Sequence, residues 1–201
     1  MRIYLISNNL LLENINYNNS SNLNIIRMTR PLSNKGETIA KSICNKDIFN
    51  DIEKIYSSFY SSALSTAKYL SEKLELEINM SEELNECQVG VLSNKNMKMV
   101  KGLQDHEFTY KLPNGESLND VGNRIDRFVK QIINSDKDSI IFTHKRAILG
   151  YLLKYSKVGY NLDDNLIVEY NGKIVYDDSE TELDIYELLI DKNEIIDIKK
   201  L

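Results

Sequence analysis

Polar side chains follow two apolar segments that are typical of buried strands. Ser7 and Asn8 come directly after an apolar run at the start of the chain, and His144 follows another run at 139–143. In open α/β sheets, residues just past such strands face the ligand crevice. Serine and asparagine are not ready acids or bases, so His144 is either a ligand-binding base or a structural histidine bonded to the backbone. Ser7 is a weak candidate nucleophile, because no carboxylate that would orient the histidine is identifiable.

Two basic residues come directly after this histidine. Lys145 and Arg146 stand at the amino end of an expected helix at 146–155, where free N–H groups already favour anions. They either supply positive charge to the crevice or point to solvent. Arg27 and Arg30 are a second source of positive charge.

Alternating strands and helices must position these residues. The clearest helix is 117–134, because its apolar residues recur at spacings of three and four. Asn34 is the expected cap of a helix that runs to about Asn45. An Asn171-Gly172 turn is typical of a hairpin. Further strands are expected at 1–6, 52–57, 76–80, 139–143, 166–170, 173–176, 183–190 and 195–199, with another helix at 61–73.

This order predicts an α/β fold, a three-layer α/β/α sandwich with a mostly parallel central sheet, in a single domain over 1–201. The last hairpin should close one edge of the sheet. The pattern at 82–110 is irregular, so Glu86 within it is either a solvated carboxylate or a pocket residue. The Asn-rich segment at 10–24 is predicted to form a long surface loop. The alternative is that it forms a lid over the crevice.

Composition excludes several classes of function. The 201 residues carry a net charge of -5, which argues against a broad nucleic-acid or anionic-membrane surface. Cys44 and Cys87 have no CxxC spacing, so we expect neither a disulfide framework nor a metal site. The start of the chain lacks the pattern of a secretory signal, and a cytoplasmic location is the simplest expectation. No organic cofactor is expected.

Six short segments are each too short to indicate a family, but their order along the chain is informative when they are taken together. They are the apolar strand Tyr4-Leu5-Ile6, Pro31-Leu32-Ser33-Asn34-Lys35-Gly36, the stretch from Ser57 to Ala67, Leu84-Asn85-Glu86 with Gly90, Gly115-Glu116-Ser117, and Phe142-Thr143-His144. This order resembles the histidine phosphatase superfamily, the phosphoglycerate-mutase-like proteins, and implies their fold.

The resemblance implies a pocket in which one histidine accepts a phosphoryl group, while arginines and a second histidine neutralise its oxygens and a carboxylate supplies a proton. Carried over residue by residue, Glu86 occupies the acid position and His144 the second-histidine position. Asn8 stands where the family has its nucleophile. Ser7 and Ser62 stand where it has arginines, and Lys145-Arg146 replaces its Gly-Gly.

These replacements predict the loss of phosphoryl transfer. The lone pair of the Asn8 amide is delocalised and cannot form a phosphoramidate, and two serines remove two fixed charges. We therefore expect a catalytically degenerate protein, a pseudophosphatase, that binds a small polar or phosphorylated ligand or a protein partner. The alternative is an active phosphatase or mutase-like enzyme on an anionic substrate, using His144 and Glu86 with relocated basic residues. Positions 7, 8 and 62 are expected to border a crevice where larger polar side chains reach water.

Overall fold

A six-stranded sheet forms the centre of the molecule. The computed structural model describes residues 1–8, 10–13, 15, 23–92, 96–179 and 183–201, and all that follows concerns this part of the chain. The strand order is β3-β2-β4-β1-β8-β9. The strands are β1 (Arg2–Asn8), β2 (Lys54–Ser57), β3 (Ile78–Met80), β4 (Ser139–Thr143), β8 (Leu183–Asp191) and β9 (Glu194–Lys200).

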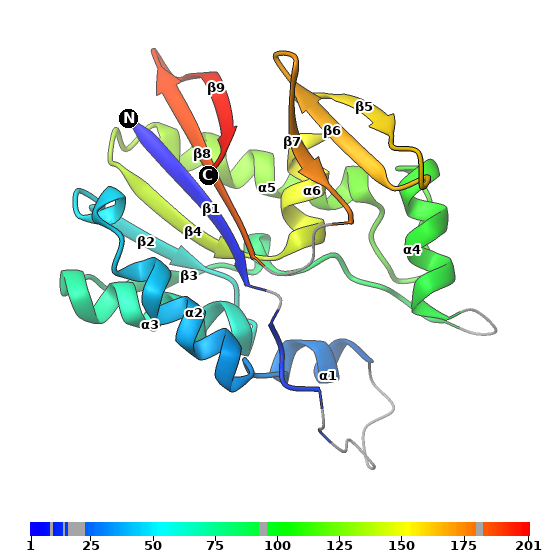
Figure 1. Ribbon diagram of the computed structural model, residues 1–201, viewed down its shortest axis with the longest axis horizontal. Helices are drawn as coiled ribbons and strands as arrows, with labels where there is room; N and C mark the ends of the chain where they lie inside the picture. The colour runs from blue at the N-terminus through cyan, green and yellow to red at the C-terminus, as the bar shows by residue number, and fades with distance from the viewer. Residues whose placement is uncertain (9, 14, 16–22, 93–95, 180–182) are drawn as a thin grey trace.

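The first four of these strands are parallel, and the last two add an antiparallel edge. The described residues also form six α-helices, shown in Figure 1. They are α1 (Leu23–Thr29), α2 (Asn34–Cys44), α3 (Ser61–Leu74), α4 (Met97–His106), α5 (Leu118–Ile133) and α6 (Lys145–Leu152). None of the helices that the structure describes is both long and apolar enough to cross a membrane.

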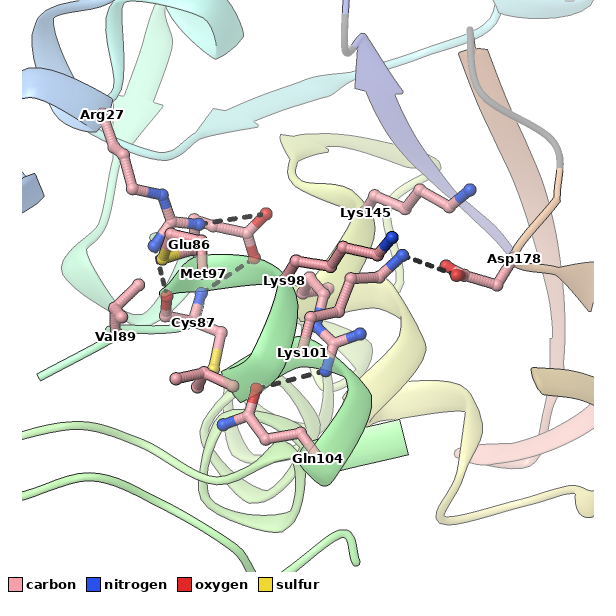
Figure 2. Close-up of a pocket in the computed structure, with 12 residues that line it drawn as sticks. Arg27, Glu86, Cys87, Val89, Met97, Lys98, Lys101, Gln104, Lys145 and Asp178 are labelled. Carbon is pink, nitrogen blue, oxygen red and sulfur yellow. Dashed lines mark hydrogen bonds and ion pairs between the residues drawn. The ribbon is translucent and has the colours of Figure 1, made fainter. Parts of the chain in front are cut away.

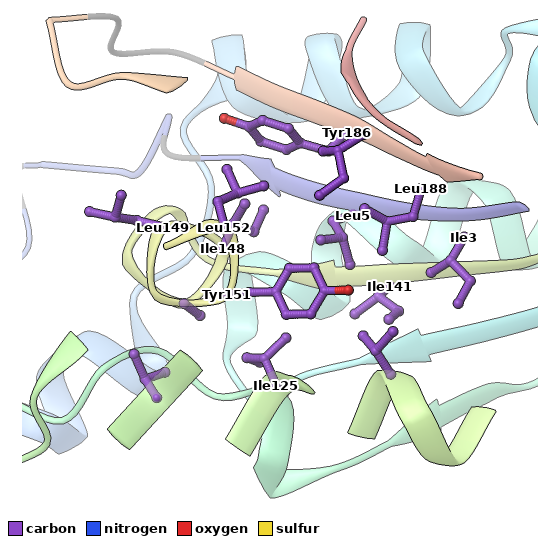
Figure 3. Close-up of a cluster of buried hydrophobic side chains, with 14 of the residues drawn as sticks. Ile3, Leu5, Ile125, Ile141, Ile148, Leu149, Tyr151, Leu152, Tyr186 and Leu188 are labelled. Atoms are coloured by element: carbon purple, nitrogen blue, oxygen red, sulfur yellow. The ribbon is translucent and has the colours of Figure 1, made fainter. Parts of the chain in front are cut away.

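Strand β1 is buried on both faces, as its continuous apolar run predicts. Because successive side chains point to opposite faces, Ile3 and Leu5 join one hydrophobic cluster and Tyr4 and Ile6 join another. The first cluster contains residues of α5 and α6, and Figure 3 shows it around Tyr151. The second contains residues of α2 and α3. The predicted α/β/α sandwich with a mostly parallel sheet is therefore confirmed.

Helices α5 and α6 approach each other closely at two glycines. A Cβ atom on Gly122 would lie 2.1 Å from the backbone oxygen of Gly150, and one on Gly150 would lie 2.6 Å from the backbone oxygen of Leu118. Real Cβ atoms do not come this close to backbone oxygens. The two glycines therefore fix how near α6, which begins next to His144, lies to α5.

A separate three-stranded sheet consists of β5 (Lys157–Tyr160), β6 (Leu166–Tyr170) and β7 (Lys173–Asp177). Asn171 and Gly172 both have positive φ, 49° and 77°, as a two-residue hairpin turn requires. The predicted hairpin is confirmed, whereas β5 was not expected.

Three further expectations need correction. Ser33 caps α2, because its side chain accepts the Gly36 N–H; Asn34 is instead the first residue of the helix. The segment at 82–110 is not irregular throughout, since it contains α4. Part of the Asn-rich segment at 10–24 belongs to α1. Most of the rest, and the lid hypothesis with it, lies outside the described residues.

Candidate functional site

The carboxyl ends of three parallel strands meet at one edge of the sheet, where the sequence predicts the site. Ser7 at the end of β1 pairs in register with Thr143 of β4, and Ser57 at the end of β2 pairs with Phe142. Ser58 is the residue directly after β2, and its N–H donates to the Phe142 carbonyl at 3.0 Å. This shared register places the residues that follow the three strands at the same edge.

His144 is buried at this edge in a hydrogen bond that the sequence did not predict. Its Nε2 lies 2.7 Å from the Ser58 Oγ, and its ring packs on Tyr60 with centroids 4.6 Å apart. The Ser58 Oγ also accepts the Tyr60 N–H at 3.2 Å, and its own proton is available to the imidazole. Burial lowers the pKa of His144 to about 4. The ring is therefore neutral at physiological pH, and Ser58, which is also fully buried, holds it in place.

This depressed pKa predicts how the stability depends on pH. The ordinary pKa of 6.5 applies in the unfolded chain and about 4 in the folded one, so the unfolded chain binds the proton more readily. The stability contribution is complete above pH 6.5 and is lost as the pH falls toward 4. We expect His144 to account for about 2 kcal/mol of lost unfolding free energy between pH 7 and pH 5. Urea titrations at both pH values should show a smaller difference for His144→Gln; an equal difference would contradict the assignment.

The side-chain amide of Asn8 forms hydrogen bonds to two backbone groups. Its Nδ2 donates to the Gly36 carbonyl at 3.1 Å, and its Oδ1 accepts the Leu10 N–H at 3.2 Å. The amide thereby links the end of β1 to α2 and to Leu10, which lies just after β1. Asn8 makes no hydrogen bond to His144 within the described residues.

The other two replaced positions are buried as well. Ser7 is 0% exposed and its Oγ has no hydrogen-bond partner among the described residues. Ser62 is 5% exposed. The side chains now at positions 7, 8 and 62 are therefore buried, and the expectation that larger polar side chains there would reach water stays a prediction.

Glu86 is a buried helix cap and not a solvated carboxylate. Its Oε1 accepts the N–H of Cys87 at 2.8 Å and the N–H of Ala147, in the first turn of α6, at 3.1 Å. Its Oε2 lies 3.9 Å from an Arg27 nitrogen, and Arg27 also donates to the Cys87 carbonyl. A negative charge at the amino end of a helix is favourable there. Glu86 therefore joins α1, its own segment and α6.

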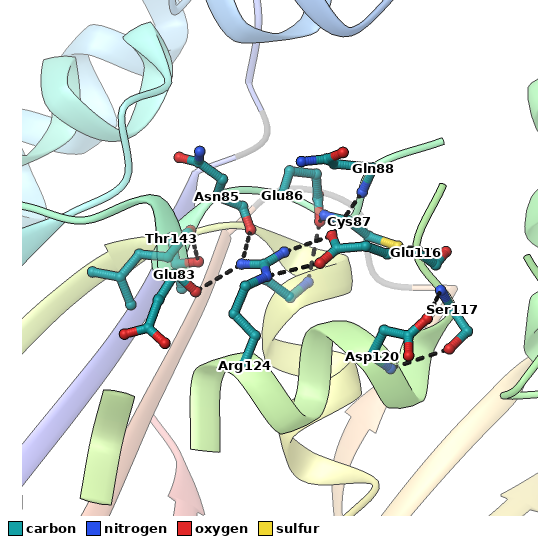
Figure 4. A network of polar contacts seen from close by, with 12 residues as sticks. Glu83, Asn85, Glu86, Cys87, Gln88, Glu116, Ser117, Asp120, Arg124 and Thr143 are labelled. Carbon is teal, nitrogen blue, oxygen red and sulfur yellow. Dashed lines mark hydrogen bonds and ion pairs between the residues drawn. The ribbon is translucent and has the colours of Figure 1, made fainter. Parts of the chain in front are cut away.

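Arg124 on α5 holds the segment that carries Glu86, as Figure 4 shows. It forms a two-pronged ion pair with Glu116 at 2.7 and 2.9 Å. Its remaining Nη1 donates to the carbonyls of Glu83 and Asn85. The Gly115-Glu116-Ser117 segment was one of the six that carry the family resemblance, but this arginine was not predicted. The available signal was the spacing along α5, which places Arg124 eight residues after Glu116.

The two basic residues after His144 are partly buried and have partners in the structure. Arg146 pairs with Asp105 at 2.5 Å and with the Gln104 side chain at 3.1 Å, both on α4. The Lys145 amino group lies 5.2 Å from the centre of the Tyr176 ring, and burial lowers its pKa. Arg146 is therefore directed to α4, whereas Lys145 is directed to Tyr176 of β7.

A cavity of about 470 Å³ lies beside α4 and the start of α6 (Figure 2). Glu86 lines it together with Lys145 and Arg146, so the structure brings three predicted site residues together. Ser7, Asn8, Ser62 and His144 do not line it. The candidate site thus has two parts, a buried strand-end cluster and a neighbouring cavity. The basic residues that line the cavity are Arg27, Lys98, Lys101, Lys145 and Arg146.

The structure thus defines an α/β/α protein with a buried polar cluster at the carboxyl ends of parallel strands and a cavity beside it. The histidine phosphatase superfamily (branch 1) matches residues 18–180, and the chain belongs to this superfamily. The resemblance inferred from the six segments is confirmed. A search of curated proteins finds no sequence match.

Solved structures share the fold at low sequence identity. A mycobacterial glucosyl-3-phosphoglycerate phosphatase in complex with inorganic phosphate has a TM-score of 0.66 and 16% identity, over 100% of this chain and 95% of that one. The protein titled mycobacterial hydrolase 2 has a TM-score of 0.64 and 17% identity, over 100% and 88%. The alpha-ribazole phosphatase from Shigella flexneri has a TM-score of 0.56 and 15% identity, over 86% and 96%.

Proposed function

We propose that this chain is a catalytically degenerate histidine phosphatase, a pseudophosphatase that retains a site for a small polar or phosphorylated ligand or a protein partner. The observation that carries the proposal is Asn8. It stands where the resemblance places the nucleophile, its amide nitrogen has no available lone pair, and both ends of the amide are hydrogen-bonded to backbone groups. A covalent phosphoryl intermediate at this position is therefore excluded by its chemistry.

The surrounding charges support the same proposal. Phosphoryl transfer depends on fixed positive charges around the transferred group, and a single arginine of this kind contributes on the order of 10³-fold or more in rate. Ser7 and Ser62 supply none. Arg146 is paired with Asp105, and the Glu86 carboxylate is engaged as a cap of α6. Arg146 and Glu86 are therefore engaged in holding the structure.

One observation favours the alternative of an active enzyme on an anionic substrate. Glu86, Lys145 and Arg146 line one cavity with Arg27, so an acid and several cations face a common space. His144, which that alternative requires as a base, does not line the cavity and is bonded to Ser58. We therefore favour the degenerate protein.

A turnover assay tests the proposal. The wild-type protein should release phosphate from p-nitrophenyl phosphate, 3-phosphoglycerate and 2,3-bisphosphoglycerate no faster than buffer does. The His144→Ala variant is the matched control, because a contaminating phosphatase would survive this change. Turnover by the wild type that disappears in His144→Ala would overturn the proposal and support the alternative.

A further inference from the structure

We propose that the cavity beside α4 binds an amphipathic organic anion, a molecule with a phosphate or carboxylate group on an apolar body. This assigns a ligand class to the retained site and rests on the proposed function. The cavity volume of about 470 Å³ lies within the roughly 300–1,000 Å³ that is usual for small-molecule sites. It accommodates a ring or short chain together with its charged group.

The net charge of the cavity lining is opposite in sign to the net charge of the whole chain. Five basic and two acidic side chains line the cavity, an excess of three positive charges in a protein whose net charge is -5. A concave wall of one sign concentrates ions of the other sign. The local charge therefore favours an anion.

Both acidic residues of the lining are already engaged. Glu86 accepts two backbone N–H groups, one of them from the first turn of α6. Asp178 binds the Lys101 amino group at 2.5 Å through one oxygen and the Tyr176 hydroxyl at 2.9 Å through the other. Neither carboxylate therefore neutralises Lys98.

Three lysines gather at one end of the cavity. Figure 2 shows the amino groups of Lys98, Lys101 and Lys145 directed toward the side where Asp178 lies. Lys98 makes no ion pair or hydrogen bond with the rest of the described chain, and it is exposed. The lowered pKa of Lys145 means that burial disfavours its charge, and a bound anion would offset this. This end suits the anionic group of a ligand.

The rest of the lining is apolar and suits a carbon body. Cys87, Val89 and Val100 are buried, and Met97 is partly exposed. Val89 and Val100 belong to a small hydrophobic cluster of their own. Methionine adapts to ligands of different shape. Inorganic phosphate would use only the lysine end, so an organic anion should bind more tightly.

Calorimetric titration of four probes tests this assignment. Phenyl phosphate and phenylacetate share an apolar ring and an anionic group; inorganic phosphate lacks the ring, and benzyl alcohol lacks the charge. At least one of the two ring-containing anions should bind at least tenfold more tightly than inorganic phosphate and benzyl alcohol. Which of them binds more tightly identifies the anionic group. If neither binds, or if inorganic phosphate binds as tightly, the proposal is overturned.

Variants locate the binding site. Lys98→Glu should weaken binding of the tighter-binding probe at least tenfold, and Lys145→Met should also weaken its binding. Lys41→Glu is the matched control, because Lys41 is exposed on α2, across the sheet, and the change in total charge is the same. Melting curves should show that all variants fold.

Asn8→Ala, at the strand-end cluster, should leave the affinity unchanged. Loss of binding in Asn8→Ala with full binding in Lys98→Glu would place the anion at the strand ends and overturn the proposal. Release of phosphate from phenyl phosphate during the titration would instead contradict the proposed function, and the Lys98→Glu result would still locate the binding.

Discussion

Gly122→Ala should lower the free energy of unfolding by about 3 kcal/mol, the upper part of the usual range for an overpacked interior. The added methyl group would lie 2.1 Å from the Gly150 carbonyl oxygen, and the obstacle is backbone that cannot rotate away. Helices α5 and α6 would have to separate. Because α6 begins directly after His144 and its first turn binds Glu86, both parts of the candidate site would move with it.

Gly102→Ala is the matched control for this prediction. Gly102 lies within α4, and a Cβ atom there would meet no atom within 4 Å. Alanine is favoured over glycine in helices by about 1 kcal/mol, so this variant should be as stable as the wild type or slightly more stable. Urea denaturation of the three proteins gives the comparison. Equal midpoints for Gly122→Ala and the wild type would show that the helices are not in contact at this position.

Arg124→Met should lower the free energy of unfolding by about 3 kcal/mol, because breaking a buried ion pair leaves one charge without compensation. The side chains of Arg124 and Glu116 are only 13% and 20% exposed. The variant also leaves the carbonyls of Glu83 and Asn85 without this donor. The segment that presents Glu86 should loosen, and its amides should exchange hydrogen faster.

Two variants make this prediction specific. Arg127→Met breaks a pair with Glu83 in which Arg127 is 63% exposed, and it should cost less than about 1 kcal/mol. Arg124→Met combined with Glu116→Met should be more stable than Arg124→Met alone, because no unpaired charge is then left buried. Similar losses for Arg124→Met and Arg127→Met would show that the Arg124 network does not hold the segment.

The parts of the fold that could be predicted are those in which one strong pattern decides the structure. Strand β1 has a continuous apolar run, and α5 has apolar residues at regular helical spacing with Ser117 and Asp120 forming its capping box. Helix α1 was missed because it is only seven residues long and buries none of its residues. Helix α4 was missed because it buries only Val100 and Gln104 and contains Gly102.

The position of the candidate site in the sheet could be predicted from the sequence, but the hydrogen-bond partners of its side chains could not. Parallel strands bring their carboxyl ends together, which is why Ser7 and Thr143 lie in register before Asn8 and His144. The partners of these side chains depend on loops and on long-range packing. Nothing local in the sequence indicates that Ser58 bonds His144 or that Glu86 caps α6.

A search for a phosphorylated protein tests directly whether this chain accepts a phosphoryl group. The wild type and His144→Ala are incubated with phosphoramidate or phenyl phosphate, and their intact masses are measured without acid, which preserves phosphohistidine. We expect no added phosphoryl group on either protein, because Asn8 cannot accept one and His144 is buried against Ser58. A phosphoryl adduct that forms on the wild type and is absent from His144→Ala would contradict this expectation.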